Sequence, residues 1–247
     1  DRDRSKEEYT GQIINSLNWL GLQWSEPLLF QSKRTNNYKI AIQKLLDSGI
    51  AYRCFLTREE LDQARKEAQT KGGDFRVPKT YRDIPLQDQK RMLNAGQSFT
   101  IRLKISPGKT HFKDHIYGAI TVNNEEIDDF IIARSDGTPT YNLTVVVDDY
   151  DMGISHVIRG EDHISNTPKQ LLIYEALGYP APEFAHLPMI LGPDKKRLSK
   201  RHGAAGIQDF RNAGFSADVL LNYLVMLGWN PGTEQELFTR DEMVEQF

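Results

Sequence analysis

Cysteine is nearly absent from this sequence, because Cys54 is the one cysteine in 247 residues. No disulfide can form within the chain, and a zinc site built from several thiolates of one chain is excluded. Long apolar runs are absent too, since none approaches the roughly 20 residues that cross a bilayer. The opening DRDRSKEEYT lacks the apolar core of a secretion signal. These absences favour a reducing compartment and exclude a membrane partner.

Net positive charge is also lacking. The formal charge is −3 at neutral pH, so no general positive field holds the chain to nucleic acid, and any phosphate contact must be local. The 39% hydrophobic content of 247 residues is enough for a real core in one large or two modest domains. The chain opens at Asp1 rather than at a methionine and reaches helix signals almost at once, so we expect a fragment.

Helix signals recur along the chain. Ser5 and Glu8 have the spacing of a capping box, and apolar residues then follow on one helical face until Gly21. A second amphipathic helix is predicted from about Asn36 to Gly49. Further helix starts are predicted at Thr57, Thr167, Ser216 and Thr239, of which Thr57 and Thr239 each stand three residues before a glutamate.

Strand signals fall into two groups. Residues 51–55, 99–105, 119–122 and 130–133 are short apolar segments separated by turn dipeptides. The last three of these predict an antiparallel meander, and we expect an inserted α+β domain over 52–139. In the second group, the β-branched run 144–147 predicts a strand buried on both faces of a parallel sheet, with 154–158 as the next strand or its continuation.

Three segments are predicted to meet at one edge of that parallel sheet. Ligands of such sheets lie beyond the carboxyl ends of the strands. Residues 141–149, residues 159–163 and the loop after the apolar run 187–191 should therefore converge there. That loop carries five basic side chains between Lys195 and Arg201. A basic run is most often a solvated face, but on a loop after a strand it can neutralise charge on transferred phosphates.

A family resemblance rests on five stretches in this order: DRDRS (1–5), YRCF (52–55), SDGTPTYNL (135–143), VVVDDYDMGISHVIRGEDHISNTP (145–168) and KRLSKRHGA (196–204). Together they resemble the bacterial-type glutamyl-tRNA synthetases, which are class I aminoacyl-tRNA synthetases. The resemblance implies an α/β fold with a Rossmann-type parallel sheet over 1–51 and 140–205. It also implies that 52–139 is an acceptor-stem-binding α+β insertion and that 206–247 starts a helical stem-contact domain.

The resemblance implies a glutamate site. Arg159 would pair with the side-chain carboxylate of glutamate, and Tyr141 would form a hydrogen-bonding wall of the same pocket. A planar guanidinium binds a carboxylate through two parallel hydrogen bonds and would lose them to an amide. In the alternative reading, Arg159 is tied to Asp148 or Asp149, and Tyr141 is an ordinary buried tyrosine.

For ATP, the resemblance implies that Lys200 holds the phosphates and the charge of the transition state, with Arg197 in the place of the loop's first lysine. The implied ATP-binding set is Asp162, Ile190, Arg197, Leu198, Ser199, Lys200 and Arg201. The backbone of Ile190 would meet the adenine while its side chain belongs to the core. Asp162 could equally cap a turn. His163 is left out, because a lone histidine more often neither binds a phosphate nor stacks on a nucleotide.

Asp148 and Asp149 are adjacent carboxylates, but we do not expect them to be catalytic. The attacking group in amino-acid activation is already a carboxylate, so no protein base is needed. At a strand end, the two acids would cap the next segment or order Arg159.

The implied function is ATP-dependent ligation of glutamate to the 3′ end of tRNA through glutamyl-adenylate, with ATP and Mg²⁺ as the substrate complex. The implied partners are glutamate and the tRNA acceptor stem, and we expect a monomer in the cytoplasm or an organelle. Many relatives carry a Cys-x-Cys zinc site in the insertion, but Cys54-Phe55-Leu56 offers one thiol, so no zinc is predicted.

Segments that the family carries on either side of this chain are missing from it. The HIGH-type helix start would precede Asp1 and the anticodon-binding domain would follow Phe247, so we expect the 247 residues alone to be inactive. Two alternatives stay open. One is the short paralogue that glutamylates queuosine, a modified base of tRNA. The other is a non-catalytic tRNA-binding module of the same fold.

Overall fold

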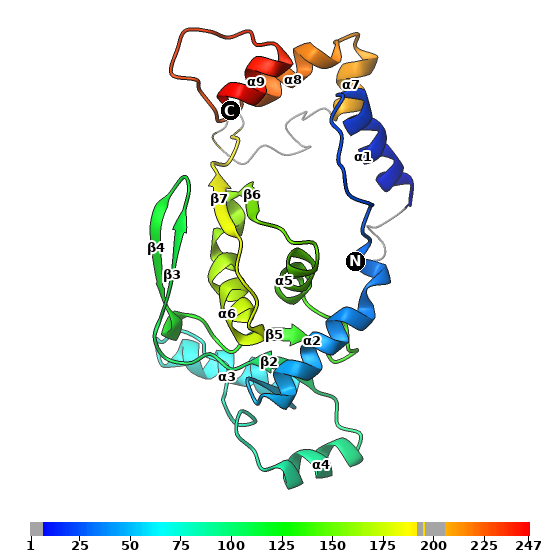
Figure 1. Cartoon of the computed structure of the whole chain (residues 1–247). Helices are drawn as coiled ribbons and strands as arrows, with labels where there is room; N and C mark the ends of the chain where they lie inside the picture. Colours follow the sequence, from blue (N-terminus) through cyan, green and yellow to red (C-terminus); the bar gives the residue numbers. More distant parts are fainter. Residues whose placement is uncertain (1–6, 192–194, 196–205) are drawn as a thin grey trace. The chain divides into compact units, whose positions relative to one another are not determined.

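The computed structural model describes residues 7–191, 195 and 206–247 (Figure 1). The chain divides into two compact units. The larger is Leu29–Leu187, and the smaller combines Asp1–Leu28 with Pro188–Phe247. Of the expected basic loop only Lys195 is described; the positions from Arg197 to Arg201 lie outside the described residues, as does Ser5 of the first predicted capping box.

The larger unit contains two sheets. The first is antiparallel in the order β1-β2-β5, formed by Ala51–Cys54, Thr100–Leu103 and Ile131–Ala133. The second has the order β4-β3-β7-β6, formed by Gly118–Asn123, Lys109–Asp114, Glu183–Leu187 and His156–Gly160. In it β3 and β4 are antiparallel, whereas β7 is parallel to both of its neighbours. The prediction of a mixed α/β fold that contains parallel strands is therefore confirmed.

The expected single meander is wrong. The strands predicted around 99–105 and 130–133 are direct neighbours in the first sheet, but the one at 119–122 belongs to the second. There it pairs with β3, a strand that the sequence did not predict. The side chains of β3 that face inward include Thr110 and Asp114, which are polar. Because its buried face is not apolar, β3 lacks the alternation of hydrophobicity that marks a half-buried strand.

The run 144–147 is a helix and not the buried strand that we predicted. It lies in α5, Tyr141–Asp151, which starts after the extended residue Thr140. Leu143, Val146 and Val147 are buried on one side of this helix. A short β-branched run fits a buried strand or a buried helix equally well by its periodicity, and here tertiary packing decides.

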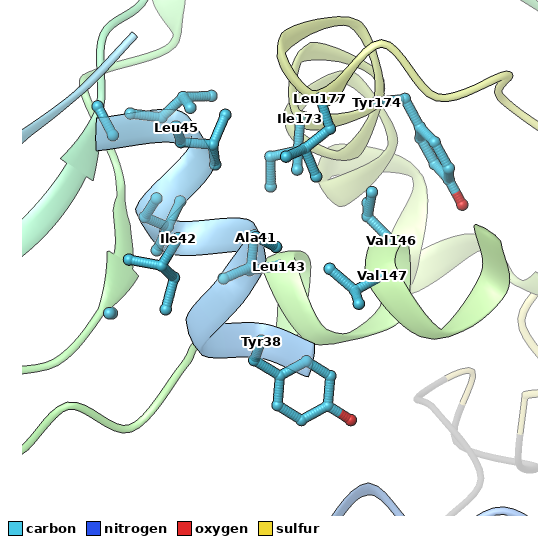
Figure 2. Close-up of a cluster of buried hydrophobic side chains, with 14 of the residues drawn as sticks. Tyr38, Ala41, Ile42, Leu45, Leu143, Val146, Val147, Ile173, Tyr174 and Leu177 are labelled. Atoms are coloured by element: carbon cyan, nitrogen blue, oxygen red, sulfur yellow. The ribbon is translucent and has the colours of Figure 1, made fainter. Parts of the chain in front are cut away.

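Three helices form the main core of the larger unit. These are α2, α5 and α6, with bounds Thr35–Asp47, Tyr141–Asp151 and Thr167–Leu177. Figure 2 labels side chains of this buried cluster from all three helices: Tyr38, Ala41, Ile42 and Leu45 from α2, Leu143, Val146 and Val147 from α5, and Ile173, Tyr174 and Leu177 from α6. Full burial of an aliphatic side chain stabilises a fold by about 1.5–3 kcal/mol, so this cluster fixes α5 and α6 as a frame.

Asp148 is buried on α5 and joins that helix to the chain before α2. Its carboxylate accepts hydrogen bonds from Arg34 Nε at 2.7 Å, from Gln31 Nε2 at 2.8 Å and from the Tyr38 hydroxyl at 2.9 Å. Removing one partner of such a buried pair leaves an uncompensated charge, so this contact is structural. Asp148 thus pairs with Arg34, so the alternative that ties Arg159 to this acid is wrong for Asp148, as is our expectation that Asp148 orders Arg159.

The remaining helices are α1 (Glu7–Trp19), α3 (Arg58–Thr70), α4 (Leu86–Asn94), α7 (Ile207–Asn212), α8 (Ala217–Val225) and α9 (Arg240–Gln246), with short 3₁₀ turns at Gln31–Lys33, Asn124–Glu126 and Glu161–Asn166. Of these helices, α1, α3, α8 and α9 begin close to their predicted starts, whereas no start was predicted for α4 or α7. The capping boxes predicted at Thr57 and Thr239 are both formed, and Ser216 Oγ accepts from the amide of Val219. No helix within the described ranges is long and apolar enough to span a bilayer.

Candidate functional site

Arg159 lies near the end of β6, at the point where this strand runs beside β7. The register places Arg159 opposite His186. Alternate residues of β6 point to opposite faces, and Val157 and Arg159 share the more buried one. Helix α6 packs on that face, since Arg159 reaches two of its side chains. The guanidinium is therefore enclosed by a strand and a helix of the same unit.

The hydrogen bonds of Arg159 go to neutral acceptors. Its Nε donates to His186 Nε2 at 3.1 Å, and its Nη2 donates to Thr167 Oγ1 at 2.8 Å and to Gln170 Oε1 at 2.9 Å. These bonds fix the plane of the guanidinium without cancelling its charge. Thr167 serves this contact and is not the helix cap that we predicted, because the cap position belongs to Asn166.

His186 links Arg159 to a buried carboxylate. Both His186 and Asp114 have fully buried side chains, and His186 Nδ1 lies 2.6 Å from Asp114 Oδ2. Arginine Nε can only donate, so His186 Nε2 must accept and carry no proton. The imidazole is therefore neutral, with its proton on Nδ1 and donated to Asp114. The order Asp114, His186, Arg159 is a chain of hydrogen bonds in which each member sets the direction of the next.

Both ends of this chain of hydrogen bonds, the Asp114 carboxylate and the Arg159 guanidinium, are charged. Burial would raise the pKa of the Asp114 carboxyl, but hydrogen bonds from the Tyr117 amide, from His186 and from the Ile116 amide outweigh burial and lower that pKa. Burial lowers the pKa of the Arg159 guanidinium, although Tyr141 and the Asp149 carboxylate oppose the change. Since arginine stays protonated in proteins, the site presents a partly buried, oriented cation.

Tyr141 stands beside this cation. It is the first residue of α5, and 46% of it is exposed, so the alternative of an ordinary buried tyrosine is wrong. Its hydroxyl lies 3.5 Å from His163 Nδ1, the two rings are 5.7 Å apart, and Tyr141 raises the pKa of the Arg159 guanidinium against the effect of burial. The structure thus brings Tyr141 and Arg159 together and adds His163, which the sequence reading left out.

The expected ATP-binding residues are only partly described. Asp162 is exposed in the 3₁₀ turn after β6, and its carboxylate folds back over Gly160, where a Cβ would come within 2.7 Å of Oδ1. Any larger residue at position 160 would therefore displace Asp162. Ile190 belongs to the smaller unit and is 46% exposed, so its side chain is not the core residue that we expected. The other members, from Arg197 to Arg201, lie outside the described residues.

Asp149 lies next to Asp148 on α5 but has a different environment. Burial raises the pKa of its carboxyl, a hydrogen bond from Tyr174 at 3.4 Å opposes this, and the charge of Asp148 adds to it. The folded protein therefore holds this proton to a higher pH than the unfolded chain does, whose aspartates titrate near ~3.9. The contribution of Asp149 to stability falls as pH rises from the unfolded pKa through the raised folded one.

We expect Asp149→Asn to remove this fall, because asparagine cannot ionise. The gain in the free energy of unfolding over the unmodified protein should be larger at pH 7 than at pH 4, as measured by urea denaturation. Asp47→Asn, at an exposed position of α2, is the matched control and should show no such trend. An Asp149→Asn effect of the same size at both pH values would contradict the prediction.

Four members of the site were missed in the sequence: Asp114, Thr167, Gln170 and His186. Asp114 and His186 are 72 residues apart in the chain and meet only because β3 and β7 pair. A weak signal was present at His186, which is the one ionisable residue of the apolar segment 184–191. A polar side chain within a buried apolar strand needs a hydrogen-bond partner, so His186 could have been recognised in the sequence as a candidate site residue.

Residues 1–247 match the family described as tRNA synthetases class I (E and Q), catalytic domain. The chain is 48% identical over 249 residues to the glutamate–tRNA ligase of Coprothermobacter proteolyticus and 49% identical over 249 residues to that of Aquifex aeolicus. These alignments cover 100% of this chain but 53% and 52% of the two relatives. The chain therefore spans about half the length of the curated relatives it matches.

A solved structure resembles the chain as a whole. It is a glutamate tRNA ligase from Elizabethkingia meningosepticum in complex with its amino acid, with a TM-score of 0.89 and 32% sequence identity. The match covers 100% of this chain and 56% of that chain. The likeness extends to the mixed α/β arrangement in which Arg159 and Tyr141 are placed.

Proposed function

The chain belongs to the class I tRNA synthetases (E and Q), catalytic domain, and from this we infer that the protein activates glutamate with ATP and transfers it to tRNA. An oxygen of the glutamate α-carboxylate attacks the α-phosphorus of ATP. Pyrophosphate leaves and glutamyl-adenylate forms. The terminal ribose hydroxyl of tRNA then attacks the acyl carbon, and AMP leaves.

The environment of Arg159 is the observation that supports glutamate as the substrate. Its guanidinium is half-buried and held in one orientation by three neutral acceptors. A cation in that state gains most from a ligand that is itself a carboxylate, because the charge-assisted pair forms in a partly desolvated place. Glutamine would offer an amide, which cannot accept two parallel bonds from the guanidinium. Tyr141 supports the same assignment, since this residue is 46% exposed and interacts with the Arg159 guanidinium.

The phosphate chemistry is proposed on the family's pattern. Lys200 would hold the ATP phosphates and the charge that grows on them in the transition state, assisted by Arg197 and the rest of the loop from Leu198 to Arg201. Mg²⁺ would arrive with ATP as part of the substrate. Activation of glutamate depends on stabilisation of charge more than on acid–base catalysis, because the attacking α-carboxylate is already ionised when it binds.

The domain roles remain proposals of the same kind. Residues 1–51 and 140–205 would form the Rossmann-type catalytic part, and 52–139 would contact the tRNA acceptor stem. Residues 206–247, whose described part holds α7, α8 and α9, would begin the stem-contact helical domain. We propose a cytoplasmic or organellar monomer.

Glutamate-dependent exchange of pyrophosphate into ATP tests the proposal. We expect a full-length protein that carries these 247 residues, with tRNA present, to support exchange with glutamate and at least ~100-fold less with glutamine, because the charge of the Arg159 guanidinium would be left unpaired against the amide. Lys200→Ala should remove exchange while tRNA binding in a filter assay persists. Exchange that does not depend on glutamate would contradict the proposal.

Two rivals give different results in the same experiment. A non-catalytic tRNA-binding module of this fold would bind tRNA without any use of ATP. The paralogue that modifies queuosine would make glutamyl-adenylate but leave the terminal ribose free. Periodate oxidation of the 3′ ribose separates these cases, because it blocks transfer to that ribose and not transfer to a base.

A further inference from the structure

Three side chains of the types that can bind a metal ion lie close together on the second sheet, away from the bonds of Arg159. His115 directly follows β3, while His156 and Glu183 are the first residues of β6 and β7. The register pairs His156 with Glu183, and the amide of His115 donates to the carbonyl of Phe184 at 2.9 Å. The three residues therefore stand side by side on three adjacent strands, and backbone pairing fixes their spacing.

Their side-chain atoms already converge. His115 Nε2 lies 2.5 Å from one oxygen of Glu183, and His156 Nε2 lies 3.9 Å from the other. One ligand atom from each residue lies within 4.8 Å of the other two. All three side chains are about half exposed, at 48%, 54% and 61%, so they can adjust and an ion can enter.

A neighbouring hydroxyl can fix the orientation and the tautomer of the His156 imidazole. Its Nδ1 lies 3.0 Å from Ser155 Oγ, outside the group of three. If Nδ1 carries the proton and donates it to this hydroxyl, the lone pair of Nε2 faces Glu183. Metal-bound histidines commonly hold their second nitrogen in this way, which selects the tautomer and the ring orientation.

We propose that His115, His156 and Glu183 bind one divalent transition-metal ion, with Zn²⁺ as the representative. Two imidazoles and one carboxylate are a donor set for Zn²⁺, Ni²⁺ or Cu²⁺, whereas Mg²⁺ and Ca²⁺ prefer oxygen alone. The remaining coordination positions face solvent and would hold water. The site uses no thiol, so it is separate from the Cys-x-Cys site whose absence the sequence predicted.

The ion would act as a clamp within the larger unit. The β3–β4 hairpin joins β7 through a single register pair, Asp114 with Phe184. A metal held by His115 on one side and by Glu183 and His156 on the other bridges this joint. Asp114, the residue before His115, is the one that holds His186. Metal binding would therefore stabilise the support of Arg159 without touching Arg159.

Calorimetric titration of the purified chain with Zn²⁺ tests this site, and the absorption spectrum of the Co²⁺ form gives a second readout. We expect one ion per chain. His115→Ala and His156→Ala should each weaken Zn²⁺ binding by at least ~10-fold. Even the loss of a residue that only hydrogen-bonds to a metal ligand commonly lowers metal affinity by about that factor. Added Zn²⁺ should raise the melting temperature of the unmodified chain and not that of His156→Ala.

His111→Ala is the matched control, since His111 is an exposed histidine on β3 whose hydrogen bond goes to Thr121. This variant should bind Zn²⁺ as the unmodified chain does. Binding that survives both His115→Ala and His156→Ala, or that is weakened equally by His111→Ala, would overturn the proposal. So would the lack of any saturable binding in the micromolar range. None of these readouts depends on enzymatic activity.

Discussion

Arg159→Ala in a full-length protein that carries these 247 residues should lower kcat/KM for glutamate in pyrophosphate exchange by ~30- to 4000-fold, because truncating one partner of a buried charged pair costs about 2–5 kcal/mol. The substitution removes the cation that would meet the glutamate side chain. It also leaves His186, Thr167 and Gln170 without their donor. The KM for ATP should change little, since the phosphates are assigned to the loop around Lys200.

Arg159→Lys is the matched control for charge. Lysine keeps the positive charge but has neither the planar fork nor the Nε that reaches His186, so its activity should lie between the unmodified protein and Arg159→Ala. Melting curves of both variants separate a loss of folding from a loss of binding. Unchanged glutamate activation by a folded Arg159→Ala protein would remove the specificity argument.

Asp114→Asn should misdirect Arg159 although the two residues are not in contact. One carboxylate oxygen of Asp114 accepts from the amides of Ile116 and Tyr117, and the other accepts from His186 Nδ1. Asparagine would keep its oxygen toward the amides and turn its NH₂ toward the imidazole. The proton of His186 would then move to Nε2, where it faces the N–H of Arg159, as donor against donor.

We expect the KM for glutamate to rise by ~10- to 100-fold with a smaller change in kcat, as for other residues that orient a binding group. Nitrogen NMR of the histidine side chains should show the proton of His186 moving from Nδ1 to Nε2. Asp136→Asn is the matched control, because Asp136 also accepts from a backbone amide but is exposed and contacts no histidine. An unchanged tautomer, or a KM equal to that of the control, would refute the orienting role of Asp114.

Local signals in the sequence predicted local structure well. The capping boxes at Thr57 and Thr239 form as expected, since a cap depends on residues three apart. Arg159 and Tyr141 were found through the motifs that contain them, and these motifs lie within one stretch of the chain. The prediction of a strand over 144–147 was wrong, because this run is too short for its periodicity to distinguish a strand from a helix. Packing in the core between α2, α5 and α6 determines that it is helical.

The support of Arg159 could not be predicted in the same way. Asp114 and His186 meet across a parallel joint between distant strands, and the polar face of β3 concealed that strand. Nothing in a single sequence states which strand is the neighbour of which. The same limit applies to His115, His156 and Glu183, which converge only once three strands are in register.

The narrow joint between β3 and β7 has a consequence for motion. A hairpin held by one register pair can separate from its neighbour at a lower free energy than a strand paired along its length. When it separates, Asp114 leaves together with the amides of Ile116 and Tyr117, which belong to the same hairpin, whereas the backbone amide and the imidazole of His186 on β7 lose their acceptor together. Because His186 in turn orients Arg159, opening of this joint would also release the orientation of the guanidinium.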